Sequence, residues 1–104
     1  MNHIAKAPVH FNRQEINAIM ALYGRMVAAG EWRDYAIDSL RDRAIFSIFR
    51  HASEMPLYRV EKIPALLHRQ GQYQVLAPGN QILKRGKDLR AVLKVFDTRR
   101  FHVV

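Results

Sequence analysis

The sequence contains no cysteine among its 104 residues. This absence excludes disulfide bonds, thiolate metal ligands and a nucleophilic thiol, and it fits a reducing compartment. Long hydrophobic runs are also missing, since no segment approaches the roughly 20 apolar residues that a membrane-spanning helix requires. The first ten residues hold one lysine and no apolar run of the kind found in secretory signals. We therefore expect a cytoplasmic protein that does not enter the membrane.

Residue types that build catalytic and metal sites are scarce as well. The three serines are Ser39, Ser47 and Ser53, and none lies in a Gly-x-Ser-x-Gly turn. The five histidines are scattered, without a His-x-x-x-His or Glu-x-x-His pair to place two ligands on one helix. The glycines of the second half stand too far apart for a phosphate-binding loop. The sequence therefore predicts a protein that is not an enzyme and has no metal or cofactor.

Acidic residues are few, and their distribution is uneven. Lysine and arginine number 17 against nine aspartates and glutamates, a formal net charge of +8. Residues 1–57 contribute only +1 of this excess. In residues 58–104, ten basic residues face only Glu61, Asp88 and Asp97. Such asymmetry suggests an anionic partner, although a high net charge can also serve solubility alone.

The apolar content is that of an ordinary globular protein. Hydrophobic residues make up 49% of the chain, and its length suffices for one hydrophobic core. We expect a single domain at residues 11–97. A flexible arm at residues 1–10 would precede it, and a flexible basic tail at residues 98–104 would follow it.

A helix is predicted at residues 13–29. Asn12 can cap it, and Glu15, three residues later, can reach back to the backbone of the cap. Apolar residues then recur with a helical period from Ile16 to Val27. Gly30 supplies the left-handed residue at which helices commonly end.

The segment after this helix is open to two interpretations. Residues 31–55 contain no glycine or proline, and their apolar residues also fit a helical stripe. However, residues 45–49 are β-branched and aromatic, and residues 57–62 alternate strictly between apolar and polar. We therefore predict a three-stranded meander, with strands at residues 35–39, 44–51 and 57–62 and a turn at residues 52–56.

A hairpin and a second helix are expected to complete the domain. Residues 64–70 suggest a short helical turn or loop, and strands at residues 73–76 and 81–84 flank Ala-Pro-Gly-Asn. Pro-Gly suits a type II turn and Gly-Asn a primed hairpin turn, so the register stays open. After Asp88, the spacing of Leu89, Val92, Leu93 and Phe96 predicts a closing helix. The expected fold is α+β: an N-terminal helix, an antiparallel sheet of meander plus hairpin, and a C-terminal helix on one sheet face.

Four segments occur in order along the chain: FNR at residues 11–13, YGRMVAAGEWRDY at residues 23–35, PLYRVEK at residues 56–62 and ILKRG at residues 82–86. Together they resemble a family of small alphaproteobacterial proteins of unknown function. The resemblance spans roughly residues 11–96. It implies a bacterial cytoplasmic protein, and it brings no established activity, ligand or catalytic residue.

The meander suggests one place for an aromatic contact. Pairing Arg50 with Tyr58 would put Phe49 beside Arg59 on one face of the sheet. An exposed aromatic ring next to arginine could stack on a nucleic-acid base. The alternative is that a helix or a partner subunit covers Phe49. The opposite face is the better core, with Phe46, Ile48, Tyr58 and Val60.

The closing helix supplies the main candidate site. With its apolar side inward, Lys87, Arg90 and Lys94 lie on the outward side, where they could track phosphates. A solvated helix face is the alternative, but such a face usually mixes charges of both signs. We expect a non-catalytic module that binds a polyanion, most plausibly nucleic acid; the alternative is a protein-interaction or regulatory module that docks an acidic partner. The candidate binding residues are Lys84, Arg85, Lys87, Arg90 and Lys94, supported by Arg59, Lys62 and Arg69.

Overall fold

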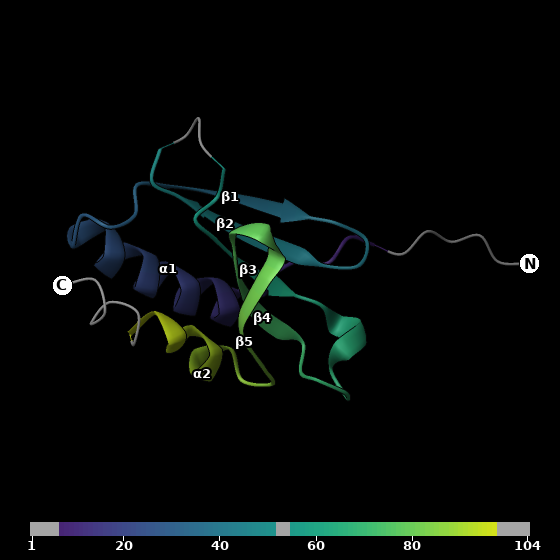
Figure 1. Cartoon of the computed structure of the whole chain (residues 1–104). Coiled ribbons are helices and arrows are strands. Elements are labelled where there is room, and N and C mark those ends of the chain that lie inside the picture. Colours follow the sequence, from purple (N-terminus) through teal and green to yellow (C-terminus); the bar gives the residue numbers. More distant parts are fainter. Residues whose placement is uncertain (1–6, 52–54, 98–104) are drawn as a thin grey trace, which may run out of the picture.

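The computed structural model describes residues 7–51 and 55–97, so the predicted basic tail lies outside the described residues. Two helices and five strands follow one another along the chain (Figure 1). In order they are α1 (Arg13–Ala28), β1 (Asp34–Ser39), β2 (Ala44–Phe49), β3 (Tyr58–Lys62), the 3-10 turn η1 (Pro64–Leu66), β4 (Tyr73–Ala77), the 3-10 turn η2 (Pro78–Asn80), β5 (Gln81–Gly86) and α2 (Leu89–Leu93). The α+β prediction is confirmed, and residues 44–49 form a strand rather than a helix.

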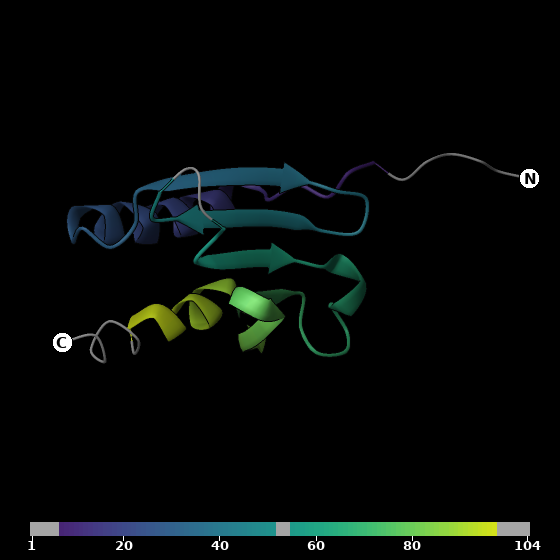
Figure 2. The ribbon, with the colours of Figure 1, turned by 45° about the horizontal axis from the view of Figure 1, so that its top comes forward.

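The five strands form one antiparallel sheet in the order β1-β2-β3-β4-β5. Each strand pairs with its neighbour in sequence, so the meander and the hairpin are continuous. Both helices lie on the same side of this sheet and contact one another, and α2 also packs against β4 and β5 (Figures 1 and 2). The result is two layers: one sheet face is covered by helices, and the other is open. No helix among the described residues is long and apolar enough to span a membrane.

The hydrophobic core fills the space between the sheet and the helices. Phe46, Val60 and Val75 are fully buried on the helix-facing side of the central strands. Phe96 lies one turn beyond α2, where its ring meets Trp32 edge-on with centroids 5.0 Å apart. The other buried apolar side chains of the helices are Ala18, Ile19, Leu22, Met26, Leu89, Val92 and Leu93.

The predicted register between β2 and β3 is wrong by two residues. Tyr58 pairs with Ile48 rather than with Arg50. A shift of two residues keeps every side chain on its predicted face, because side chains alternate with a period of two. The expected contact is nevertheless lost, since Arg59 lies opposite Ser47 and not beside Phe49. The cause is a longer connection than the turn expected at residues 52–56: β2 already ends at Phe49.

The second hairpin has a three-residue loop. Ala77 pairs with Gln81, and both Gly79 and Asn80 have left-handed backbone conformations, with φ of 76° and 62°. A two-residue primed turn is therefore not formed. The ladder also carries a register shift next to Val75.

Gly71 brings the loop before β4 against the start of α2. Its φ is +90°, and a Cβ at this position would overlap the backbone of Gly86 and Lys87. A side chain at residue 71 would push these segments apart. This close approach fixes where α2 begins, and with it the position of the cations on that helix.

Candidate functional site

A groove runs between α1 and α2. It consists of two adjoining depressions, of ≈ 500 Å³ and ≈ 250 Å³, that share Ala18 and Arg90 in their linings. The small side chains of Ala18 and Ala21 on α1 allow α2 to approach. We call this feature the α1–α2 groove.

Four cationic side chains line the α1–α2 groove. Lys87 and Arg90 border the larger depression, and Arg25, Arg90 and Lys94 border the smaller one. Within the described part of the chain, no ion pair joins any of these four groups to a carboxylate. They are therefore available to a ligand.

Three carboxylates share the lining, but two of them are committed to the fold. Glu15 is buried and ion-pairs with Lys62, whose Nζ lies 2.9 Å from its Oε1. Asp88 caps α2 by accepting the backbone N–H of Arg90 at 3.1 Å. Only Asp97 is an exposed carboxylate without such a role in this region. Four cations thus face three carboxylates in the lining, and one of these carboxylates, Glu15, is already neutralised by Lys62.

The floor of the larger depression is rigid. The hydroxyl of Tyr73 donates to Glu15, and Lys62 donates both to Glu15 and to the backbone oxygen of His10, at 3.0 Å. Burial raises the pKa of Tyr73, and its hydrogen bond to the Glu15 carboxylate raises it further. The phenol therefore stays protonated and continues to donate.

The eight candidate binding residues predicted from the sequence lie in different parts of the structure. Lys87, Arg90 and Lys94, predicted on the outward side of the closing helix, line the α1–α2 groove. Lys62 lies beneath α1 in its pair with Glu15. Lys84 is exposed on β5 and does not line the groove, and Arg69 is exposed after η1.

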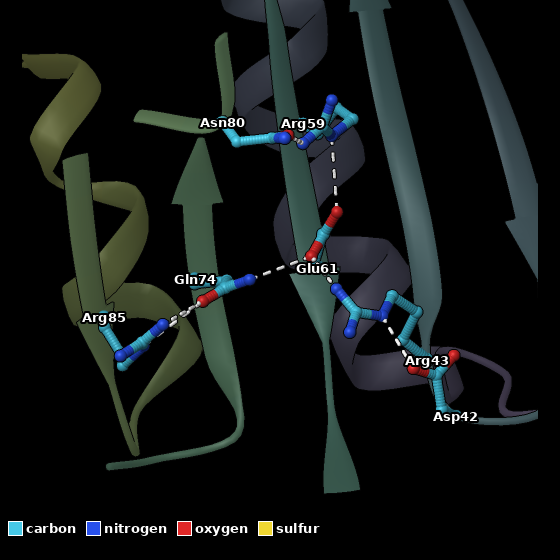
Figure 3. Close-up of polar contacts among 7 residues, drawn as sticks. All are labelled: Asp42, Arg43, Arg59, Glu61, Gln74, Asn80 and Arg85. Carbon is cyan, nitrogen blue, oxygen red and sulfur yellow. Dashed lines mark hydrogen bonds and ion pairs between the residues drawn. The ribbon is translucent and has the colours of Figure 1, made fainter. Parts of the chain in front are cut away.

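Arg59 and Arg85 lie on the other side of the sheet, on the open face (Figure 3). Arg59 Nε is 3.3 Å from Glu61 Oε2, and its Nη2 donates to Asn80. Arg85 donates twice to the amide oxygen of Gln74, at 3.2 Å and 2.8 Å. These two guanidinium groups therefore serve the packing of the open face and are not part of the groove.

Glu61 is the centre of that open-face network. Only 3% of its surface is exposed, although no helix covers it. Its Oε1 accepts from Arg43 and from Gln74, each at 2.8 Å, and Figure 3 shows Glu61 between the side chains of Arg43, Arg59 and Gln74. Arginine side chains laid across the sheet thus shield the carboxylate from water.

The charge balance distinguishes the two surfaces. On the open face, the strands carry Arg59 and Arg85 together with Asp34, Asp38 and Glu61. Among these strand residues the cations do not outnumber the carboxylates. The α1–α2 groove is the better candidate.

Sequence reasoning missed Arg25. Its place in the groove depends on the packing of α1 against α2, which no local pattern reveals. The available signal was the series Ala18, Ala21 and Arg25, since small residues at helical spacing often mark a close helix contact.

Among the residues that the structure describes, no group of three His, Asp or Glu side chains gathers to hold a metal ion.

Comparison with known proteins gives one match. Residues 9–93 match a family model described as "Protein of unknown function (DUF2794)". Comparisons with curated proteins and with solved structures found no match.

Proposed function

The chain belongs to this family of proteins of unknown function, DUF2794, and we propose that it is a non-catalytic module that binds a polyanion, most plausibly nucleic acid, in the α1–α2 groove. Lys87, Arg90, Lys94 and Arg25 would contact phosphate groups. Contacts of this kind position a nucleic acid without reading its sequence, and they give a strongly salt-dependent affinity.

One observation supports this proposal above all. Four cations, from α1 and from the segment that contains α2, converge on one groove, while other candidate cations, namely Arg59, Lys62 and Arg85, are held by intramolecular acceptors. Charges of one sign placed together destabilise a folded protein unless a ligand relieves the repulsion.

The proposal is tested with short fluorescent RNA and DNA, single- and double-stranded, at about 50 mM salt, where electrostatic binding is strongest. The triple variant Lys87→Glu/Arg90→Glu/Lys94→Glu is expected to lower the affinity at least tenfold. The plot of log affinity against log salt concentration should become less steep, its slope decreasing in magnitude by about 2–3.

A matched control uses three exposed arginines of the first half. The variant Arg33→Glu/Arg41→Glu/Arg50→Glu changes the net charge equally but leaves the groove untouched. It should weaken binding much less than the groove variant. Equal losses would show a diffuse charge effect, and absence of binding at about 50 mM salt would refute the proposal. Retention on heparin without any binding of nucleic acid would instead favour the acidic protein partner.

A further inference from the structure

The two edges of the sheet differ in how well they are protected. At one edge, β5 carries Lys84 and Arg85, has a register shift against β4, and packs beside α2. These are devices by which proteins prevent unwanted strand pairing. At the other edge, β1 pairs with β2 over six residues without a register shift. It contains no proline, lysine or arginine.

The backbone of β1 presents unused hydrogen-bonding groups to solvent. The N–H of Leu40 donates to the oxygen of Arg43 at 2.8 Å. This bond shows which residues of β1 direct their backbone groups toward β2 and which direct them outward. Ala36 and Asp38 then point their backbone groups toward β2, and Ile37 points its groups outward. Val9 donates to the backbone oxygen of Leu40, directly after β1, and His10 bonds to the side chain of Ser39 at the end of the strand. Among the described residues, the edge from Asp34 to Asp38 has no neighbouring strand.

The helix-facing side of this edge is apolar and only partly covered. Ile37 is 45% exposed and Tyr35 40% exposed. The ring of Tyr35 stacks on Phe46 and meets Tyr23 of α1 edge-on, each with centroids 5.0 Å apart. Val27, one turn further along α1, is also exposed. A strand added beside β1 would place alternate side chains against this apolar margin.

The open side of the same edge is acidic. Asp34 and Asp38 lie opposite Phe49 and Ile45, which places both carboxylates on the open face at a spacing of four residues. Within the described residues, neither carboxylate forms an ion pair, and Asp34 Oδ1 accepts the backbone N–H of Tyr35 at 2.8 Å. An added strand would therefore need cationic side chains on this face.

We propose that the outer edge of β1 is a docking site for an extended segment of another protein in which basic residues alternate with apolar residues. The segment would extend the sheet by one strand. Its backbone would bond the outward groups of Ile37, its apolar side chains would pack on Tyr35 and Ile37, and its cations would pair with Asp34 and Asp38. Added strands of this kind obtain affinity from the backbone and specificity from alternate side chains.

A second copy of the chain fits this edge poorly. Two β1 strands related by a two-fold axis can pair over most of their length if they are centred on Ala36 or on Ile37. The first register places Asp34 opposite Asp38, and the second brings together Arg33 and Arg41, which flank the strand. Like charges directly opposite each other destabilise a strand pair. The charge pattern therefore favours a basic segment over self-pairing.

The test measures amide hydrogen exchange of the full chain by NMR, with a peptide of alternating lysine and valine as the probe. The Ile37 amide should exchange about tenfold more slowly when the free peptide is at about ten times its Kd. The amides of Ala36 and Asp38 already bond to β2, so their exchange should change little. This alternation is specific to pairing at the edge, and general stabilisation would slow all three amides together.

Two pairs of variants test the side chains. Ile37→Lys should weaken peptide binding at least tenfold, whereas Ile82→Lys, at a position 46% exposed on β5, should leave it unchanged. Asp34→Asn/Asp38→Asn should also weaken binding at least tenfold, and Asp97→Asn on the far helix should not. The asparagine variant keeps the side-chain shape, so a loss cannot be attributed to misfolding.

Three outcomes would overturn the proposal. The first is equal binding of a peptide in which the lysines and valines are grouped in two blocks. The second is a response of amides in the α1–α2 groove instead of β1. The third is a dimer in sedimentation experiments whose Ile37 amide is protected without peptide, which would identify a second copy as the occupant.

Discussion

Glu15 shows how one side chain can fulfil a local and a tertiary role together. It completes the capping box of α1: its Oε1 accepts the backbone N–H of Asn12 at 2.7 Å, and Asn12 Oδ1 accepts the N–H of Glu15 at 2.8 Å. The same carboxylate receives Tyr73 from β4 and Lys62 from β3. The start of α1 is thereby attached to the middle of the sheet.

These donors determine the acidity of Glu15. Burial alone would raise its pKa, but the hydrogen bonds from Tyr73, from the Asn12 backbone and from Lys62 together lower the pKa below its ordinary value of 4.5. A carboxylate with a lowered pKa in the folded state stabilises the fold at pH values above its unfolded pKa. This stabilisation is lost as the pH falls through the folded pKa.

We predict that Glu15→Gln lowers the free energy of unfolding by about 1–3 kcal/mol at neutral pH, because Lys62 and Tyr73 lose a charged acceptor. Protonation removes the same charge from the native protein, so the difference between the two proteins should shrink as the pH falls below about 4.5. Urea denaturation at pH about 7 and about 3.5 measures this. A difference that does not vary with pH would contradict the assigned role of the charge.

At the scale of elements, β3 contributes side chains to both faces of the sheet. Successive residues of a strand face opposite sides, so Lys62 reaches the helix layer and Glu61 reaches the open face. Glu61 is bonded to Arg59 on the same strand, to Arg43 directly before β2 and to Gln74 on β4. The network links the strands on the side that has no helices.

We predict that Glu61→Ala destabilises the fold by about 2–4 kcal/mol, because it leaves two arginines and an amide without their shared buried acceptor. Asp42→Ala is the matched control. It also removes an ion pair of Arg43, but the Asp42 side chain is 64% exposed, and such surface pairs contribute about 0–1 kcal/mol. Denaturant titrations measure the free energy of unfolding of both variants. An equal decrease in the two would show that the burial of Glu61 does not increase its contribution to stability.

At the scale of the whole molecule, the basic side chains fall into two groups. One part neutralises buried carboxylates, and another part gathers in the α1–α2 groove. A protein that tolerates such repulsion for binding should gain stability when the repulsion is removed.

We predict that Lys87→Gln/Arg90→Gln/Lys94→Gln raises the free energy of unfolding by about 0.5–1 kcal/mol at low salt, since each nearby pair of like charges costs up to about 0.5 kcal/mol in a water-like medium. Screening should abolish the gain at about 0.5 M NaCl. Arg59→Gln is the control, and it should destabilise because Arg59 serves Glu61 and Asn80. Thermal unfolding at both salt concentrations measures the effect. A destabilised triple variant would mean that these cations support the fold.

Much of the fold could be predicted because its signals are local. The capping box and apolar period defined α1 to within a residue at its end. Alternation assigned the faces of β2 and β3 correctly, even though the register was off by two. The alternation of apolar and polar residues determines which face of the sheet each side chain occupies, whereas the register depends on the length of the loop that connects the two strands.

The sequence by itself determined the elements, the two-faced strands and the surplus of positive charge, because each of these follows from neighbouring residues. Only the tertiary structure decided which cations are free. Three basic side chains are held by acceptors that sequence periodicity does not reveal: Lys62 by Glu15, Arg59 by Glu61 and Arg85 by Gln74. Arg25, in contrast, lies near Arg90 because α1 packs against α2. The tertiary structure also determined that β1 lies at an unprotected edge of the sheet. Strand order depends on pairing between residues that are distant in sequence.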